Sequence, residues 1–140
     1  MVVYAEDMNY WKTSNSAPDA WIEKAKREIV SAGGKILSEA FGSESGRAAF
    51  MLSFSFGQDT YRAVWPVLPV RAKASERAAR VQAATMLYHD VKHRCVLVKV
   101  FGAREAFFQF LLLPDGRTAA QLAAPEMIER FPRLLAAPSD

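Results

Sequence analysis

The stretch Arg47–Phe56, with the sequence RAAFMLSFSF, decides the fold. Five apolar residues occupy every second position and share one strongly aromatic face: Ala48, Phe50, Leu52, Phe54 and Phe56. A period of two is typical of a β-strand with one buried face. Turn-forming residues lie on both sides, at Gly42–Gly46 and Gly57–Asp59. The sequence therefore predicts a strand over Arg47–Phe56 with a turn at each end.

The runs on either side of these turns complete a small sheet. Lys35–Ala40 and Thr60–Trp65 are predicted to be the neighbouring strands of an antiparallel meander. Pro66 and Pro69 end the third strand, since proline has no N–H to donate to a sheet. A three-stranded sheet has an apolar face to bury, and we expect the flanking helices to cover it.

One helix is predicted before the sheet. Ser16 is placed to accept a hydrogen bond from the first turn, Pro18 is tolerated there, and Asp19 suits the positive end of a helix. Gly33 and Gly34 are expected to end it, because glycine adopts the left-handed cap conformation without strain.

A second, longer helix is predicted over Lys73–Arg94, which contains no glycine or proline. Lys73, Arg77 and Arg80 lie on one stripe of this helix. The same stripe continues into apolar residues: Leu87, Val91 and Cys95. We expect a solvated basic first half and a second half embedded in the core.

The remaining sequence predicts shorter elements. Ala103–Leu113 is ambiguous between helix and strand, and helix is favoured because its first residues are good helix formers. A turn is predicted at Pro114–Gly116, Thr118 and Gln121 form a capping-box pattern, and a last short helix is expected over Glu126–Phe131.

These patterns predict the α+β class, with a three-stranded antiparallel meander packed against helices and a long central basic helix. The 140 residues fit a single domain spanning residues 1–140. Its N-terminal segment, residues 1–15, and its tail, residues 136–140, are expected to be loosely ordered.

Positive charge is concentrated in the segment that contains the long helix. Between Arg71 and Arg104 eight Lys or Arg residues face only Glu76 and Asp90, which gives a net charge of +6 in a chain whose total is +3. A basic element is what an anionic partner recognises. The candidate phosphate-contacting residues are Arg71, Lys73, Arg77, Arg80, Lys92, Arg94 and Lys99.

The charge pattern favours a nonenzymatic nucleic-acid-binding module, in which these residues contact backbone phosphates. Single-stranded DNA or RNA is preferred, because no helix-turn-helix or zinc module for reading a duplex is present. No catalytic residue, metal ligand or cofactor is assigned, since the sequence contains no nucleophile-elbow, phosphate-loop or dinucleotide-binding motif.

Aromatic residues on adjacent predicted strands have two interpretations. Aromatic side chains on a sheet can stack on nucleic-acid bases, but more often they form the core. We favour the core for this set: Phe50, Phe54, Phe56, Tyr61 and Trp65.

Two other functions are kept as alternatives. Nine Phe and three Trp in a short chain leave room for a self-associating structural or adaptor protein, a homodimer or higher oligomer. His89 and His93 in HDVKH resemble the HExxH pattern of zinc hydrolases, with an aspartate in place of the glutamate. We discount this metal site because no third ligand is apparent and cationic Lys92 and Arg94 lie beside it.

The sequence also predicts a cytoplasmic location without membrane contact. Glu6 and Asp7 occupy positions where a secretory signal would be basic. The apolar runs are shorter than the roughly 20 residues needed to span a bilayer. The single cysteine, Cys95, is expected to be a buried thiol in a reducing compartment.

The order of elements over Lys35–Arg94, three strands followed by a long basic helix, resembles the β-β-β-α core of Rad52-like single-strand annealing proteins. The segments YHDVKHR (88–94) and FFQFLLLPDGRT (107–118) resemble small uncharacterised proteins of phages and other mobile elements. The first resemblance concerns element order alone, with no residue motif, and no functional residue is carried across from it.

Overall fold

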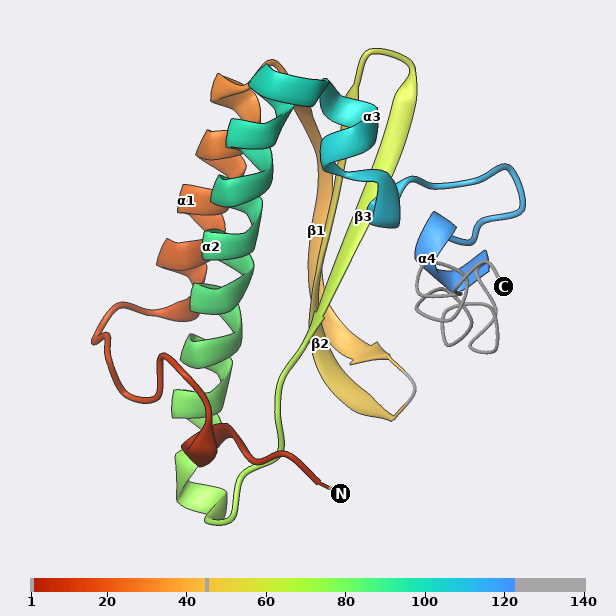
Figure 1. Ribbon diagram of the computed structural model, residues 1–140. Coiled ribbons are helices and arrows are strands. Elements are labelled where there is room, and N and C mark those ends of the chain that lie inside the picture. Colours follow the sequence, from red (N-terminus) through yellow and green to blue (C-terminus); the bar gives the residue numbers. More distant parts are fainter. Residues whose placement is uncertain (1, 45, 123–140) are drawn as a thin grey trace, which may run out of the picture.

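A three-stranded antiparallel sheet lies beside a pair of helices (Figure 1). The computed structural model describes residues 2–44 and 46–122. The strands are β1 (Lys35–Glu44), β2 (Arg47–Phe56) and β3 (Asp59–Pro66), in the order β1-β2-β3. The predicted α+β class and meander are confirmed, and β2 has the predicted bounds.

The turn predicted at Gly42–Gly46 is shorter than expected. Residues 42–44 continue β1, because the antiparallel register runs on through Gly42↔Ala49 to Glu44↔Arg47. This extension carries the β1–β2 hairpin two residue pairs beyond β3, because β3 pairs with β2 only as far as Ala49↔Pro66.

Two helices, α1 (Pro18–Ser31) and α2 (Glu76–Phe101), lie side by side and run in the same direction (Figure 1). α2 has 26 residues and continues past the predicted end at Arg94. It stops only at Gly102, whose φ of 92° is accessible to glycine at little cost. Lys73 lies in a separate 3₁₀ turn, η2 (Lys73–Ser75), and not in the helix as predicted.

The predicted N-cap of α1 is wrong. Ala17 occupies the cap position, and no side chain caps this helix. The backbone N–H of Ser16 donates instead to Ser14 Oγ at 3.0 Å. Pro18 begins the helix as expected. At the other end Gly33 has a φ of 102°, in agreement with the predicted glycine stop.

The core lies between the helix pair and the inner face of the sheet. Ile22, Ala25 and Ile29 of α1 pack there with aromatic residues of the strands. Phe54 and Tyr61 are fully buried and Phe50 is nearly so, which confirms the core interpretation for these three; Phe56 and Trp65 pack against the same core and are half-buried. These side chains are therefore committed to folding.

The middle of α2 is buried in the core, from Ala79 to Cys95. The predicted burial of Leu87, Val91 and Cys95 is confirmed, but the buried residues begin earlier, at Ala79. Both ends of the helix are exposed. The reason is length: α2 spans about 39 Å and α1 about 21 Å at 1.5 Å per residue, so α2 projects beyond its neighbour.

Ala103–Leu113 is not the continuous helix that we favoured. A single turn, α3 (Ala103–Ala106), is followed by the 3₁₀ turn η3 (Phe108–Phe110), and then Leu112 donates its N–H to the Thr60 carbonyl at 2.8 Å. The chain breaks its helix because the fully buried Phe107 inserts among strand aromatics, with its ring centroid 5.0 Å from that of Phe54.

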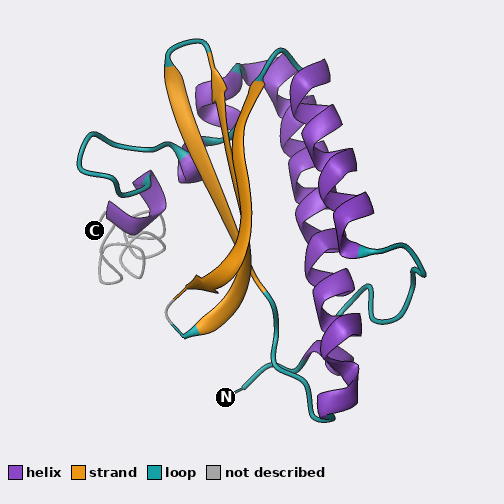
Figure 2. Ribbon diagram, turned by 180° about the vertical axis from the view of Figure 1, so that it is seen from behind, coloured by secondary structure: helices purple, strands orange, loops and turns teal. Residues whose placement is uncertain are grey.

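The predicted turn at Pro114–Gly116 and the capping box are confirmed. Thr118 donates its N–H to Gln121 Oε1 at 2.9 Å, and Gln121 donates its N–H to Thr118 Oγ1 at 3.3 Å. They open α4 (Ala119–Leu122), which lies on the opposite side of the sheet from the helix pair in the views of Figures 1 and 2. The helix expected over Glu126–Phe131 and the tail, residues 136–140, lie outside the described residues.

None of the helices in the described part of the chain is both long and apolar enough to cross a membrane.

Candidate nucleic-acid interface

Arg71 is bound to the N-terminal segment. Its guanidinium donates to both carboxylate oxygens of Asp7, and its backbone N–H donates to Glu6 Oε2 at 2.9 Å. Its charged end also lies 4.5 Å from the ring centroid of Tyr4. The hydrogen bonds from Arg71 hold the pKa of Asp7 below its ordinary value of 3.8. Arg71, which the sequence predicts to contact phosphate, is therefore already paired with the carboxylate of Asp7.

Arg94 is similarly occupied. Its Nε donates to Asp90 Oδ2 at 2.9 Å, one turn back along α2, and its Nη1 donates to the Ala106 carbonyl at 3.1 Å. Its Nη2 also contacts Gln109 Oε1, and its charged end stacks 4.5 Å from the ring centroid of Phe110. Arg94 thus ties α2 to the segment that follows it.

The remaining predicted cations at the start of α2 are exposed: Lys73, Arg77 and Arg80. The fold adds Lys12, from the segment before α1, and Arg47, from the tip of the β1–β2 hairpin. None of these five forms an ion pair with a described carboxylate. We call this set the basic cluster: Lys12, Arg47, Lys73, Arg77 and Arg80.

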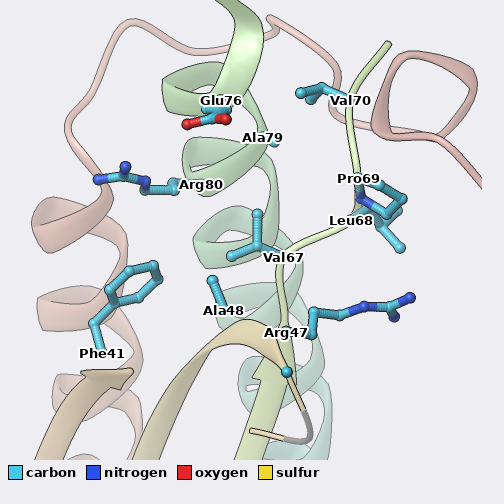
Figure 3. A pocket seen from close by; sticks show the side chains of 11 residues that line it. Phe41, Arg47, Ala48, Val67, Leu68, Pro69, Val70, Glu76, Ala79 and Arg80 are labelled. Atoms are coloured by element: carbon cyan, nitrogen blue, oxygen red, sulfur yellow. The ribbon is translucent and has the colours of Figure 1, made fainter. Parts of the chain in front are cut away.

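A groove of about 530 Å³ lies beside α2 on the Arg80 side (Figure 3). Its walls come from the β1–β2 hairpin tip, the chain after β3 and the first turns of α2. Phe41 and Arg80 lie along one side of it and Arg47 on the other, with Val67 between them (Figure 3). Glu76 is the one described carboxylate among the lining residues. We call this hollow the Phe41 groove.

A second groove, of about 390 Å³, flanks the same helix turns on the Arg77 side. Lys12 lines it together with small polar residues of the segment before α1: Ser14, Asn15 and Ser16. The backbone of Lys12 has a φ of 52°, a left-handed conformation that is uncommon for a residue other than glycine. Of the basic cluster, Arg47 and Arg80 thus line the Phe41 groove and Lys12 and Arg77 line the second groove, while Lys73 lies in η2 just before α2.

Lys92 and Lys99 are exposed on the distal half of α2. On a helical wheel both lie within about 60° of Arg77, but roughly 22 Å and 33 Å further along the axis. They belong to the same side of the helix as Arg77 and not to the same local cluster. The structure thus divides the predicted residues into a proximal cluster, two distal lysines, and two arginines with internal partners.

His89 is engaged with aromatic side chains. Its ring stacks on Tyr10, with ring centroids 4.9 Å apart and planes 14° apart, and Trp21 and Tyr88 lie beside it. Within residues 2–44 and 46–122 no group of three His, Cys, Asp or Glu residues is placed to hold a metal ion. The geometry therefore gives the zinc-hydrolase alternative no third ligand.

No family model matches this chain, and no curated protein or solved structure matches it significantly.

Sequence analysis missed Lys12, Arg47 and Phe41. Arg47 follows Gly46 at the hairpin turn, so a search for cations at turn tips would have found it. Lys12 carried no such signal, because its neighbour Arg77 is distant in sequence. Phe41 falls between the predicted strand Lys35–Ala40 and the predicted turn Gly42–Gly46, whereas in the structure β1 continues through it and its side chain lines the groove, 46% exposed.

Proposed function

We propose that this protein is a nonenzymatic nucleic-acid-binding module that contacts backbone phosphates through the basic cluster around the start of α2. One observation carries the proposal: exposed cations from three separate segments line two hollows beside the first turns of α2, namely Lys12, Arg47, Arg77 and Arg80, and none has an ion-pair partner among the described carboxylates. Elsewhere Arg71, Arg94 and Arg104 are neutralised by Asp7, Asp90 and Asp59.

The chemistry of the cluster suits phosphate. Three of its members are arginines, whose planar guanidinium groups donate paired hydrogen bonds to phosphate oxygens. Such contacts give affinity and salt dependence without reading sequence. Lys92 and Lys99 are proposed as an extension along α2, at distances that a strand of several nucleotides can span.

Single-stranded substrates are preferred. No described element has the form of a recognition helix that enters a groove, since α2 is embedded by its middle. The β-β-β-α element order, similar to that of Rad52-like annealing proteins, is consistent with this preference. A buried and unpaired thiol at Cys95 suits a reducing compartment, and we propose that the protein acts in the cytoplasm.

The test is fluorescence anisotropy of labelled single- and double-stranded oligonucleotides at low and physiological salt. The variant Arg77→Glu/Arg80→Glu reverses two charges of the cluster. The matched control Lys24→Glu/Lys35→Glu reverses two exposed charges elsewhere, one on α1 and one on β1. Circular dichroism verifies that both variants fold.

We expect binding that weakens as salt rises and that falls at least tenfold in the cluster variant, with a shallower salt slope. The control should retain most of the affinity. Absence of binding at low salt, or equal losses in the two variants, would contradict the proposed site.

Self-association is a second candidate function, favoured by exposed apolar residues at the distal end of α2. Val96, Val100 and Phe101 are each more than half exposed there. Light scattering of the wild type and of the variant Val96→Ser/Val100→Ser distinguishes a dimer formed through these residues from a monomer. A dimer that dissociates in the variant supports this candidate, whereas a monomer at high protein concentration eliminates it.

A further inference from the structure

The Phe41 groove combines an exposed aromatic ring with apolar walls and a charged rim. Phe41 is supported from below by Phe50, whose ring centroid lies 4.7 Å away and which is itself buried. The guanidinium of Arg80 lies 5.5 Å from the Phe41 ring centroid. Ala48 and Val67 provide apolar surface next to the ring (Figure 3).

The size and chemistry of the groove fit one nucleotide. Its volume of about 530 Å³ lies within the range of pockets that hold small ligands. A nucleobase presents two flat π-faces, and an exposed aromatic side chain stacks on such a face. The aliphatic floor accommodates the rest of the base without requiring a hydrogen-bond partner.

The charges of the groove indicate which part of a nucleotide lies where. Glu76 borders the groove on the Arg80 side, one turn before Arg80 on α2, whereas the interior beside Phe41 is lined by the uncharged residues Ala48 and Val67 (Figure 3). Arg80 and Arg47 lie on opposite sides (Figure 3). The neutral base therefore suits the interior, and the phosphates suit the two ends.

We infer that the Phe41 groove accepts one unpaired base of a nucleic-acid strand, stacked on Phe41, with the flanking phosphates at Arg80 and Arg47. In a duplex both faces of each base are covered by neighbouring pairs, so the groove selects single strands or flipped-out bases. This inference rests on the proposed function and adds to it the group that is recognised. It also gives the exposed position of Phe41 a role.

The decisive probe is a pair of oligonucleotides of about 12 nucleotides, within the site sizes of small single-strand-binding folds. One is homothymidine, and the other is an abasic strand with the same phosphates and no bases. The variants are Phe41→Leu, which keeps an apolar side chain but removes the ring, and the control Phe108→Ala, which removes an exposed ring in η3. Binding is measured by anisotropy at one fixed salt concentration.

We expect Phe41→Leu to weaken homothymidine binding by roughly five- to hundredfold, the usual contribution of one aromatic–base stack. The wild type should bind the abasic strand more weakly by a similar factor, and Phe41→Leu should cause no further loss on that strand. Phe108→Ala should bind both strands as the wild type does.

Equal binding of the two strands by the wild type would overturn the base site, and this comparison needs no variant to fold. Unchanged homothymidine binding by a folded Phe41→Leu protein would do the same. If the Arg77→Glu/Arg80→Glu variant still loses affinity in either case, phosphate binding stands and only the base site fails. If the wild type binds none of the strands, both the base site and the proposed phosphate-binding function are contradicted.

Discussion

The side-chain amide of Gln82 donates a hydrogen bond to the backbone carbonyl of Ala5 at 2.8 Å, although the two residues are 77 positions apart. The same nitrogen donates to the carbonyl of Asn9 at 3.0 Å. Gln82 is 1% exposed, on the face of α2 that the N-terminal segment covers. One buried amide thus holds that segment beside the basic cluster.

Gln82→Met should destabilise the protein by about 1–3 kcal/mol, because the buried carbonyl of Ala5 and the partly buried carbonyl of Asn9 each lose a donor while the side-chain volume is nearly kept. Urea unfolding measures the change. The control Gln58→Met alters an exposed glutamine in the β2–β3 turn and should remain within about 0.5 kcal/mol of the wild type. Equal stability of the two variants would contradict the role of Gln82.

Adjacent phenylalanines should differ sharply in their effect on stability. Phe107 is fully buried among Phe54, Phe56 and Tyr61, whereas Phe108 is 55% exposed. Phe107→Ala should cost about 3–5 kcal/mol, the usual cost of truncating a buried aromatic. Phe108→Ala should cost no more than about 0.5 kcal/mol. Thermal or urea unfolding compares them, and similar losses would refute the placement of Phe107.

The contact between Asp7 and Arg71 should make stability depend on pH. Because hydrogen bonding to Arg71 lowers the pKa of Asp7, its stabilising contribution is complete above the ordinary value of 3.8. It is lost as the pH falls through the lower pKa of the folded protein. Asp7→Asn should therefore unfold at lower urea concentration than the wild type at pH 7, and the difference should shrink in strong acid. A constant difference across this range would exclude the linkage.

Cys95 should react slowly in the folded protein. Burial raises the pKa of its thiol from 9.0 to about 12. The thiolate population at pH 8 is then reduced roughly a thousandfold. Labelling with a chromogenic disulfide should be at least that much slower in buffer than in guanidinium chloride. Comparable rates would show that the middle of α2 opens readily.

Glu76 opposes phosphate binding at the rim of the Phe41 groove. Glu76→Gln should therefore tighten oligonucleotide binding at low salt by about 1.5- to 5-fold, the size expected of an exposed charge interaction. The gain should disappear near 1 M salt, where the screening length is about 3 Å. Anisotropy at both salt concentrations measures it. Weaker binding in the variant would indicate that Glu76 contacts the ligand favourably.

The sequence by itself determined the secondary structure and much of the core. The alternation in β2, the glycine stop at Gly33 and the uninterrupted helix through Leu87 depend on periodicity and backbone preference, which act over a few residues. The prediction of a continuous helix over Ala103–Leu113 failed because tertiary packing outweighed these local preferences. Phe107 entered the core and broke a helix that local propensity favoured.

Only the tertiary structure decided which cations are available to a partner. Arg71 was as basic in sequence as Arg80, but Asp7, 64 positions away, binds it in the fold. Lys12 and Arg47 entered the cluster from distant segments. Ion pairing depends on distances through space, which the order of residues along the chain does not fix.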